Sequence, residues 1–268
     1  MNGEDMARTI SQGLSGILEE LELERPQLVT MEDIERLAGD AGIATPAAIV
    51  ASRLRAAGWL IPTGIRGIWE FAPAELAGAY PSGDPLLVVK AFALAHPDAQ
   101  PAVSLHAAAW ALGLADRVPA EIDVAFPAIP RVKIPGGLSA SAYAPNIDAV
   151  EAKGVRVLAP ESVVCHMAQR PSAMRSWQSV SEWIEDVAYE LDADRMLEEL
   201  GGRAASVRTR AGYLLQGMRP DIAAGIRKAG ISKTKVRFGS GPAIRCDEGW
   251  MMVDCVLPFD PREKEALR

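Results

Sequence analysis

The sequence lacks the features of several large classes of protein. No apolar run approaches the roughly 18 residues that a membrane-spanning helix needs. The first residues, Met-Asn-Gly-Glu-Asp, carry acids where a secretory signal would carry lysine or arginine. We therefore expect a cytoplasmic protein with no membrane association.

Cysteine is scarce, and its spacing excludes the usual cysteine chemistry. Cys165, Cys246 and Cys255 form no Cys-x-x-Cys pair and cannot all pair internally, so we expect core thiols in a reducing compartment. The chain also has no zinc-ligand spacing and no glycine-rich phosphate loop. We expect neither a metal nor a cofactor.

The candidate catalytic groups do not form a complete site. Cys165 and His166 are adjacent on a predicted helix, so they do not share a face and cannot act as nucleophile and base. Glu121 and Asp123 share one face of a predicted strand, but the next position on that face is Ala125 rather than a lysine. A metal-dependent nuclease is thus disfavoured, and we expect no enzymatic activity.

The charge is unevenly distributed along the chain. The net charge is −7, yet residues 201–245 hold ten basic residues and a single acid, Asp221. This segment could form a second nucleic-acid surface, or its charges could pair with the acidic helices predicted within residues 182–199. The residues proposed for such a surface are Arg203, Arg208, Arg210, Lys233, Lys235 and Arg237.

The segment from Thr30 to Phe71 predicts a winged helix-turn-helix. Thr30 suits the N-cap of a first helix that Gly42 interrupts, and a second helix over 47–57 ends before Gly58. Strands at 59–61 and 66–71, joined by a turn, would form the wing. Such a unit places its second helix in the DNA major groove.

Three arginines and no acid lie between Ile43 and Trp69, which supports DNA binding. With Val50, Leu54 and Ala57 in the core, the opposite face of the second helix would be small, polar or basic. A winged helix that binds protein, with incidental arginines, is the alternative. The expected DNA contacts are Thr45, Ser52, Arg53, Arg55 and, in the wing, Arg66.

The length of 268 residues suggests two domains. A linker rich in glycine and proline at 72–84 separates a winged-helix domain, 1–80, from a second domain, 84–268. Strands followed by a run of helices predict an α+β fold with a small, mostly antiparallel sheet. The expected helices are 8–21 in the first domain and 85–95, 105–111, 162–168, 180–190, 194–200, 204–215 and 222–228 in the second, with strands at 122–126, 131–134, 139–143, 155–158, 235–238 and 251–257.

The order of these features resembles that of AbiEi-type antitoxins of type IV toxin–antitoxin systems. The likeness rests on Arg-Ala-Ala-Gly-Trp-Leu (55–60) before a Gly-x-x-Gly wing and on Val-Ser-Leu-His-Ala-Ala-Ala-Trp-Ala-Leu-Gly-Leu (103–114). It continues in Gly-Val-Arg-Val-Leu-Ala-Pro-Glu (154–161) and Arg-Thr-Arg-Ala-Gly-Tyr-Leu-Leu (208–215). Residues 239–268 match no feature of that family, which leaves a partner contact open for them.

The resemblance implies an autorepressor that binds inverted repeats in its own promoter as a monomer loading cooperatively on DNA. Its second domain would counteract a nucleotidyltransferase-like toxin without a stable toxin complex. Two rivals stay open. One is a ligand-responsive winged-helix transcription factor outside toxin–antitoxin systems, and the other is a nuclease that uses Glu121 and Asp123.

Overall fold

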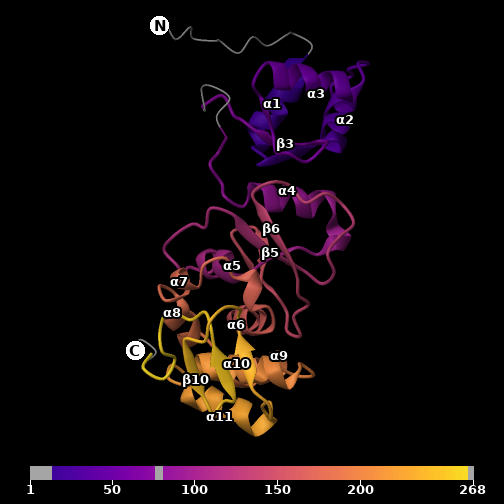
Figure 1. The fold of residues 1–268 in the computed structure, drawn as a ribbon. Helices are drawn as coiled ribbons and strands as arrows, with labels where there is room; N and C mark the ends of the chain where they lie inside the picture. The colour runs from indigo at the N-terminus through magenta and orange to yellow at the C-terminus, as the bar shows by residue number, and fades with distance from the viewer. Residues whose placement is uncertain (1–13, 76–80, 265–268) are drawn as a thin grey trace, which may run out of the picture. The chain divides into compact units, whose positions relative to one another are not determined.

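The computed structural model describes residues 14–75 and 81–264. The chain is a mixed α+β protein with three separate sheets (Figure 1). Its contacts divide it into two compact units, Met1–Pro97 and Asp98–Arg268. Within the described residues, no helix has the length and apolar character needed to cross a membrane.

The first unit combines helices with a three-stranded antiparallel sheet of order β1-β3-β2. The helices and the hairpin lie where the sequence predicts them, whereas β1 was not expected because it is only three residues long. Of the helix predicted over residues 8–21, positions 8–13 lie outside the described residues. The elements are α1 (Ser15–Glu24), β1 (Leu28–Thr30), α2 (Met31–Asp40), α3 (Ala47–Ala56), β2 (Leu60–Pro62), β3 (Ile68–Phe71) and α4 (Leu87–Ala95).

Local hydrogen bonds define where α2 begins and where α3 ends. The Thr30 hydroxyl accepts a hydrogen bond from the Asp33 amide at 3.1 Å, and the Asp33 carboxylate accepts one from the Thr30 amide at 2.8 Å. This capping box satisfies two backbone donors at the start of α2. Gly58 follows α3 with φ 79°, a left-handed conformation that favours glycine.

An apolar core holds these helices on the sheet. Ile17 of α1, Ile34 of α2 and Leu54 of α3 are fully buried, and Trp59 stacks on Phe71 at the hairpin. Burial on this scale is the main favourable term in folding. The core fixes which face of α3 is left outside.

Helix α4 groups with the first unit rather than with the second. The ammonium of Lys90 lies 2.7 Å from the Asp84 carboxylate and 2.9 Å from the Gln27 side-chain oxygen. The Gln27 amide in turn donates to Asp84 at 2.6 Å. These bonds tie the start of α4 to the first unit, so the division at residue 97 lies beyond the linker predicted at 72–84.

The larger sheet of the second unit has the order β6-β5-β4-β8-β7. It is mixed, not mostly antiparallel as the sequence suggested, because β5 pairs parallel with β6 and β4 parallel with β8. The strand expected at 131–134 is absent: this segment has no regular structure, and its flanking residues Pro130 and Pro135 have no amide hydrogen for a ladder. The strands are β4 (Ala102–Val103), β5 (Ile122–Phe126), β6 (Leu138–Ala142), β7 (Val150–Ala152) and β8 (Val155–Val157).

Helices cover this sheet, and α6 packs against both α5 and α10 (Figure 1). The single helix expected over 180–190 is split in two by a turn at residues 181–183. The helices are α5 (Leu105–Ala111), α6 (Pro160–Gln169), α7 (Trp177–Val180), α8 (Ile184–Tyr189), α9 (Ala193–Glu199), α10 (Ala205–Leu215) and α11 (Pro220–Ala229), with 3₁₀ turns η2 (Pro97–Ala99) and η3 (Pro171–Ala173).

The C-terminal residues complete the core of the second unit. They form a sheet of β9 (Val236–Phe238), β10 (Arg245–Asp247) and β11 (Met252–Asp254), with the order β10-β11-β9. Trp250, 3% exposed, packs on α10 at Gly212, and the Arg227 guanidinium lies 4.1 Å from the centre of its ring. A side chain at Gly212 would occupy the space of the indole.

We expect Gly212→Ala to lower the free energy of unfolding of the second unit by about 1–3 kcal/mol, because the new methyl would lie 2.3 Å from the ring of Trp250. Chemical denaturation measures the change. Gly225→Ala on neighbouring α11 is the matched control, since its methyl would make only an ordinary contact with Leu197 at 3.5 Å. Equal stability of the two variants would contradict the docking of Trp250 on α10.

Candidate nucleic-acid interface

The outer face of α3 is an uncharged ridge with an arginine on each side. The core holds Val50, Ala51 and Leu54 of this helix. At 100° per residue, the face opposite them carries Ile49, Ser52 and Ala56, and Thr45 lies just before the helix. All are exposed except Thr45, which is half-buried.

Two exposed arginines flank this ridge. Arg55 lies on the side of α3 that faces the hairpin, and helical geometry places Arg53 at the other edge. Neither forms an ion pair with another described residue, whereas Arg36 of α2 has Glu24, Asp33 and Asp40 within 4.0 Å. The guanidinium groups beside the ridge are free to bind an external anion.

The hairpin forms a second wall beside α3. The Thr63 hydroxyl donates to the Ile68 carbonyl at 2.8 Å and accepts from the Ile65 amide at 3.2 Å, which fixes the turn. Gly64 and Gly67 have φ 84° and 78°, conformations that suit glycine. Arg66 stands exposed between them, and the groove between α3 and the hairpin has a volume of about 770 Å³.

The structure therefore brings together Ser52, Arg55 and Arg66, which line this groove, and it places Arg53 and Thr45 on the same helix or just before it. The sequence interpretation overlooked Ile49, an apolar side chain that is 46% exposed. The spacing of 4, 3 and 4 residues from Thr45 through Ile49 and Ser52 to Ala56 is the signal that would have found it.

The basic residues of the second unit are mostly engaged inside the protein. Arg203, with a side chain 13% exposed, binds the Glu199 carboxylate and the Ala144 carbonyl, both at 2.7 Å, and the Gln169 side chain at 2.8 Å. Its guanidinium also lies 4.8 Å from the centre of the Tyr143 ring. These contacts leave no side of the group for a phosphate.

Arg208, Arg210 and Arg237 bind backbone carbonyl oxygens. Arg208 donates to the carbonyls of Gly230 and Arg203 at 2.6 and 2.5 Å. Arg210 donates to those of Arg237 and Ala168 at 2.8 and 3.0 Å, and burial lowers its pKa. Arg237 donates to the Gly241 carbonyl at 2.5 Å. The carbonyl oxygens of turns and helix ends, rather than the acidic helices, account for much of this positive charge.

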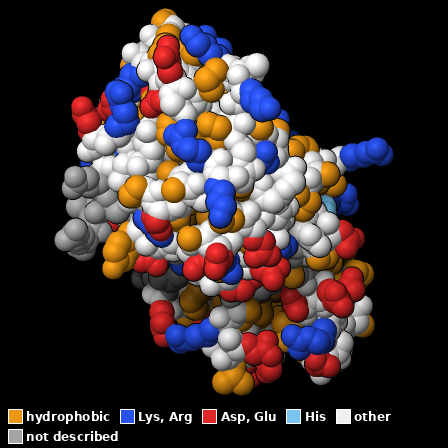
Figure 2. Space-filling view, turned by 90° about the horizontal axis from the view of Figure 1, so that it is seen from below, with side chains coloured by type: hydrophobic (Ala, Val, Ile, Leu, Met, Phe, Trp, Pro, Cys, Tyr) orange, Lys and Arg blue, Asp and Glu red, His pale blue; other side chains and the backbone are white. Residues whose placement is uncertain are grey.

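Lys233 and Lys235 are different, since both are exposed and neither has a hydrogen bond or ion pair with another described residue. Figure 2 shows one face of the molecule, on which Lys and Arg side chains stand singly among uncharged surface instead of forming one continuous patch. Of the six residues expected to form a second surface, these two lysines fit it best.

A buried carboxylate joins several segments of the second unit by hydrogen bonds. Glu199, fully buried, accepts hydrogen bonds from the amides of Asn146 and Ile147 at 2.9 and 3.1 Å and from the Ser162 hydroxyl at 3.0 Å. It also accepts a short hydrogen bond from the Tyr143 hydroxyl, whose pKa is raised by burial. The carboxylate links the loop after β6 to α6 and α9.

A fully buried histidine continues this network. His166 Nδ1 lies 2.7 Å from the Ser104 hydroxyl, and His166 Nε2 lies 3.2 Å from that of Ser141. Ser104 directly precedes α5, but its side chain makes no capping bond. Burial, aided by the charges of Arg170 and Arg203, lowers the pKa of His166 to about 3, so the ring is neutral near pH 7. His166 and its two serine partners are buried, so this group is part of the packed core.

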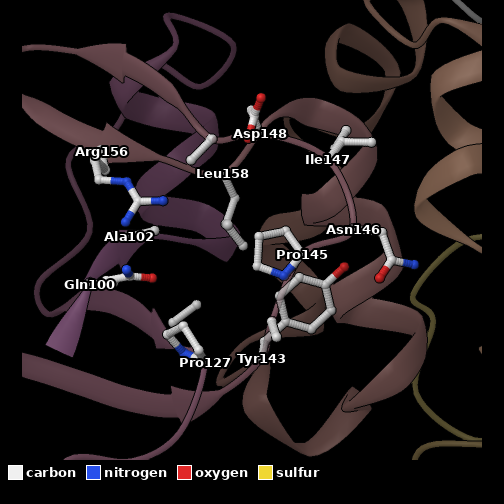
Figure 3. Close-up of a pocket in the computed structure, with 13 residues that line it drawn as sticks. Gln100, Ala102, Pro127, Tyr143, Pro145, Asn146, Ile147, Asp148, Arg156 and Leu158 are labelled. Atoms are coloured by element: carbon white, nitrogen blue, oxygen red, sulfur yellow. The ribbon is translucent and has the colours of Figure 1, made fainter. Parts of the chain in front are cut away.

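A small pocket of about 190 Å³ opens beside the network (Figure 3). Two small side chains line it, those of Ala102 in β4 and Ala125 in β5, which are directly paired across the sheet. Arg156 and Gln100 stand on one side and Tyr143 on the other (Figure 3). The Arg156 side chain has no hydrogen bond or ion pair with another described residue. Because its guanidinium is positively charged, a ligand of this pocket would place an anionic group beside it.

The two carboxylates considered for a nuclease site lie in different environments. Glu121 is exposed and pairs with Arg175, while Asp123 is buried, and burial raises its pKa to about 7. Over the part of the chain that the structure describes, no group of three His, Cys, Asp or Glu residues could hold a metal ion. Cys165 and Cys255 are buried thiols as expected, but Cys246 is exposed.

Residues 101–217 match the family of the AbiEi antitoxin C-terminal domain. The match supports an AbiEi-type antitoxin. The family match supports the role of antitoxin in a toxin–antitoxin system, which implies a toxin as its counterpart, and the AbiEi family is not a family of enzymes. The AbiEi domain contains the larger sheet, the Glu199 network and helices α5 to α10.

Among solved structures, the chain is similar to the RV2827C protein from Mycobacterium tuberculosis, with a TM-score of 0.77 and 24% sequence identity. The similarity covers 94% of each chain and therefore includes residues on both sides of the AbiEi domain. At this identity the likeness concerns the fold. A comparison with curated proteins found no match.

We expect His166 to make the AbiEi domain less stable as the pH falls from about 6.5 towards 3, whereas Asp123, whose pKa burial raises to about 7, acts in the opposite direction below that pH. The unfolded chain gains a proton on His166 near its ordinary pKa of 6.5, whereas the folded chain gains it near 3, so protons favour unfolding between these values. This residue contributes up to about 1.4 kcal/mol per pH unit. Chemical denaturation should therefore show the stability of the natural protein falling relative to that of His166→Gln as the pH decreases over this range, although the variant is less stable at pH 7.5; a constant difference between the two would contradict the assignment.

Proposed function

We propose that the chain is a DNA-binding antitoxin that represses its own toxin–antitoxin operon and counteracts a nucleotidyltransferase-like toxin. The observation that carries this proposal is the AbiEi domain preceded by a unit whose α3 presents an acid-free face with free arginines. The operon and the toxin are implied by the resemblance of about residues 8–230 to AbiEi-type antitoxins.

The first unit has the element order of a winged helix-turn-helix. Helices α2 and α3 are joined by a turn that contains Gly42, and the β2–β3 hairpin follows directly. In such proteins the second helix enters the major groove. Strand β1 completes a three-stranded sheet that supports the hairpin. In this proposal, residues 1–80 bind DNA and residues 84–268 provide antitoxicity.

The charge of the proposed interface suits DNA. Arg53, Arg55 and Arg66 are exposed, and no acid lies in the sequence from residue 41 to residue 69. Contacts from arginine to phosphate position a protein on the duplex and make binding dependent on salt. Three such contacts supply modest affinity, which agrees with a monomer that loads cooperatively on inverted repeats.

A second contact region is proposed at Lys233 and Lys235, because their side chains are exposed and have no hydrogen-bond or ion-pair partner among the described residues. Arg203, Arg208, Arg210 and Arg237 are left out of it, since their guanidinium groups bind internal oxygens. The toxin is counteracted without a stable complex in this proposal, as the family resemblance implies.

We expect Arg53→Ala combined with Arg55→Ala to weaken binding to the DNA upstream of the gene strongly without unfolding the protein. Two lost phosphate contacts should reduce the slope of log K against log salt by about 1.8. Fluorescence anisotropy from 50 to ~200 mM salt, against unrelated DNA of equal length, measures both effects. Arg36→Ala on α2 is the control, because its guanidinium is paired within α1 and α2.

The same variant separates repression from antitoxicity. When co-expressed with the neighbouring toxin gene, it should still prevent growth arrest while a reporter under the operon promoter is derepressed. Unchanged DNA binding by the double variant would refute α3 as the reading helix. Equal, salt-sensitive binding of the natural protein to all DNA would refute selective repression.

We expect Lys233→Ala combined with Lys235→Ala to weaken binding to all DNA sequences equally and to reduce the salt slope by a further ~1.8. A change that is independent of sequence distinguishes phosphate contacts from base contacts. Arg131→Ala with Lys133→Ala is the matched control, as these residues are exposed and have the same spacing. If both pairs change binding to the same extent, the effect is one of net charge alone.

A further inference from the structure

The ridge of α3 has an unusual composition for a helix that is proposed to read DNA. Ile49, Ser52 and Ala56 follow one another along its outermost line, Thr45 lies just before the helix, and Ile49 is 46% exposed. Contact of this aliphatic side chain with water is unfavourable, and the side chain is not part of the protein core. A partner surface with apolar groups in reach would cover it.

The ridge holds none of the side chains that form paired hydrogen bonds with purines. Arginine and lysine recognise guanine in the major groove, and asparagine and glutamine recognise adenine. The two arginines of α3 lie beside the ridge, not on it. Hydroxyl groups at Thr45 and Ser52 can bond to any base and therefore discriminate weakly.

The widths of an α-helix and of the DNA major groove decide which side chains of α3 reach phosphates and which reach bases. An α-helix with its side chains is about 10–12 Å wide, close to the ~12 Å of the major groove. Side chains on the two edges therefore face the two phosphate backbones, and the ridge faces the base edges. Arg53 and Arg55 occupy the edges, so Ile49 meets the bases.

We infer that α3 recognises thymine through apolar contact between Ile49 and the 5-methyl group, with Ala56 as a smaller contact on the same line. The thymine methyl is the apolar group that the major groove displays. This inference rests on the proposed DNA binding and adds to it the class of sequence read: half-sites in which thymines face the ridge. Ile49 is the residue that determines specificity.

The test compares thymine with uracil, which differs only in the methyl group. The full-length protein first selects its preferred duplex from a randomised 20-base-pair library and from its own upstream DNA. That duplex is then prepared with uracil replacing each thymine in turn, and affinities are measured for the natural protein and for Ile49→Ala. Leu23→Ala, a residue of α1 that is 79% exposed, is the control.

We expect uracil at one or two positions per half-site to weaken binding of the natural protein about fourfold for each methyl lost. Ile49→Ala should bind the thymine duplex more weakly by a similar factor and should no longer distinguish thymine from uracil. The control variant should keep the full discrimination. Circular dichroism confirms folding, and because Ile49 lies outside the core, Ile49→Ala should unfold at the same temperature as the natural protein.

Three results have different meanings. Selective binding with equal affinity for thymine and uracil overturns the inference and leaves the proposed repressor intact. Discrimination that persists in Ile49→Ala overturns the assignment of this residue. Absence of any selective binding overturns the proposed function together with the inference.

Discussion

The AbiEi domain depends on one buried charge. The Glu199 carboxylate accepts five hydrogen bonds, from two backbone amides, two hydroxyls and the guanidinium of Arg203. A buried carboxylate is tolerated only when such partners replace water, and the removal of one partner leaves an uncompensated charge. The loop after β6, α6 and α9 are therefore held in one arrangement, and the wall of the Arg156 pocket is fixed with them.

Much of the local structure could be predicted from the sequence because its signals are local. Thr30, Gly42 and Gly58 mark helix ends by capping and backbone conformation, and α2, α3 and the hairpin lie at the predicted positions. The pairing of distant strands is not encoded by local signals. The parallel pairing of β5 with β6 could not be found because both strands carry the same alternating pattern as an antiparallel pair would.

The candidate site shows the same division between local and distant information. The outer face of α3 follows from helical periodicity, and the same periodicity points to Ile49. The basic segment 201–245 could not be interpreted from charge alone, because a guanidinium binds a carbonyl oxygen as readily as a phosphate. Arg208 and Arg210 demonstrate this, since each binds two carbonyl oxygens, and three of these four belong to residues more than 20 positions away in the sequence.

The position of Trp250 also sets an order for synthesis of the chain. This ring fills the space above Gly212, so the second unit lacks a core side chain until translation has passed residue 250. At about 5–20 residues per second, residue 250 is added roughly 8–31 s after Pro97, with which the first unit ends. Each newly made chain thus completes its first unit well before its second unit.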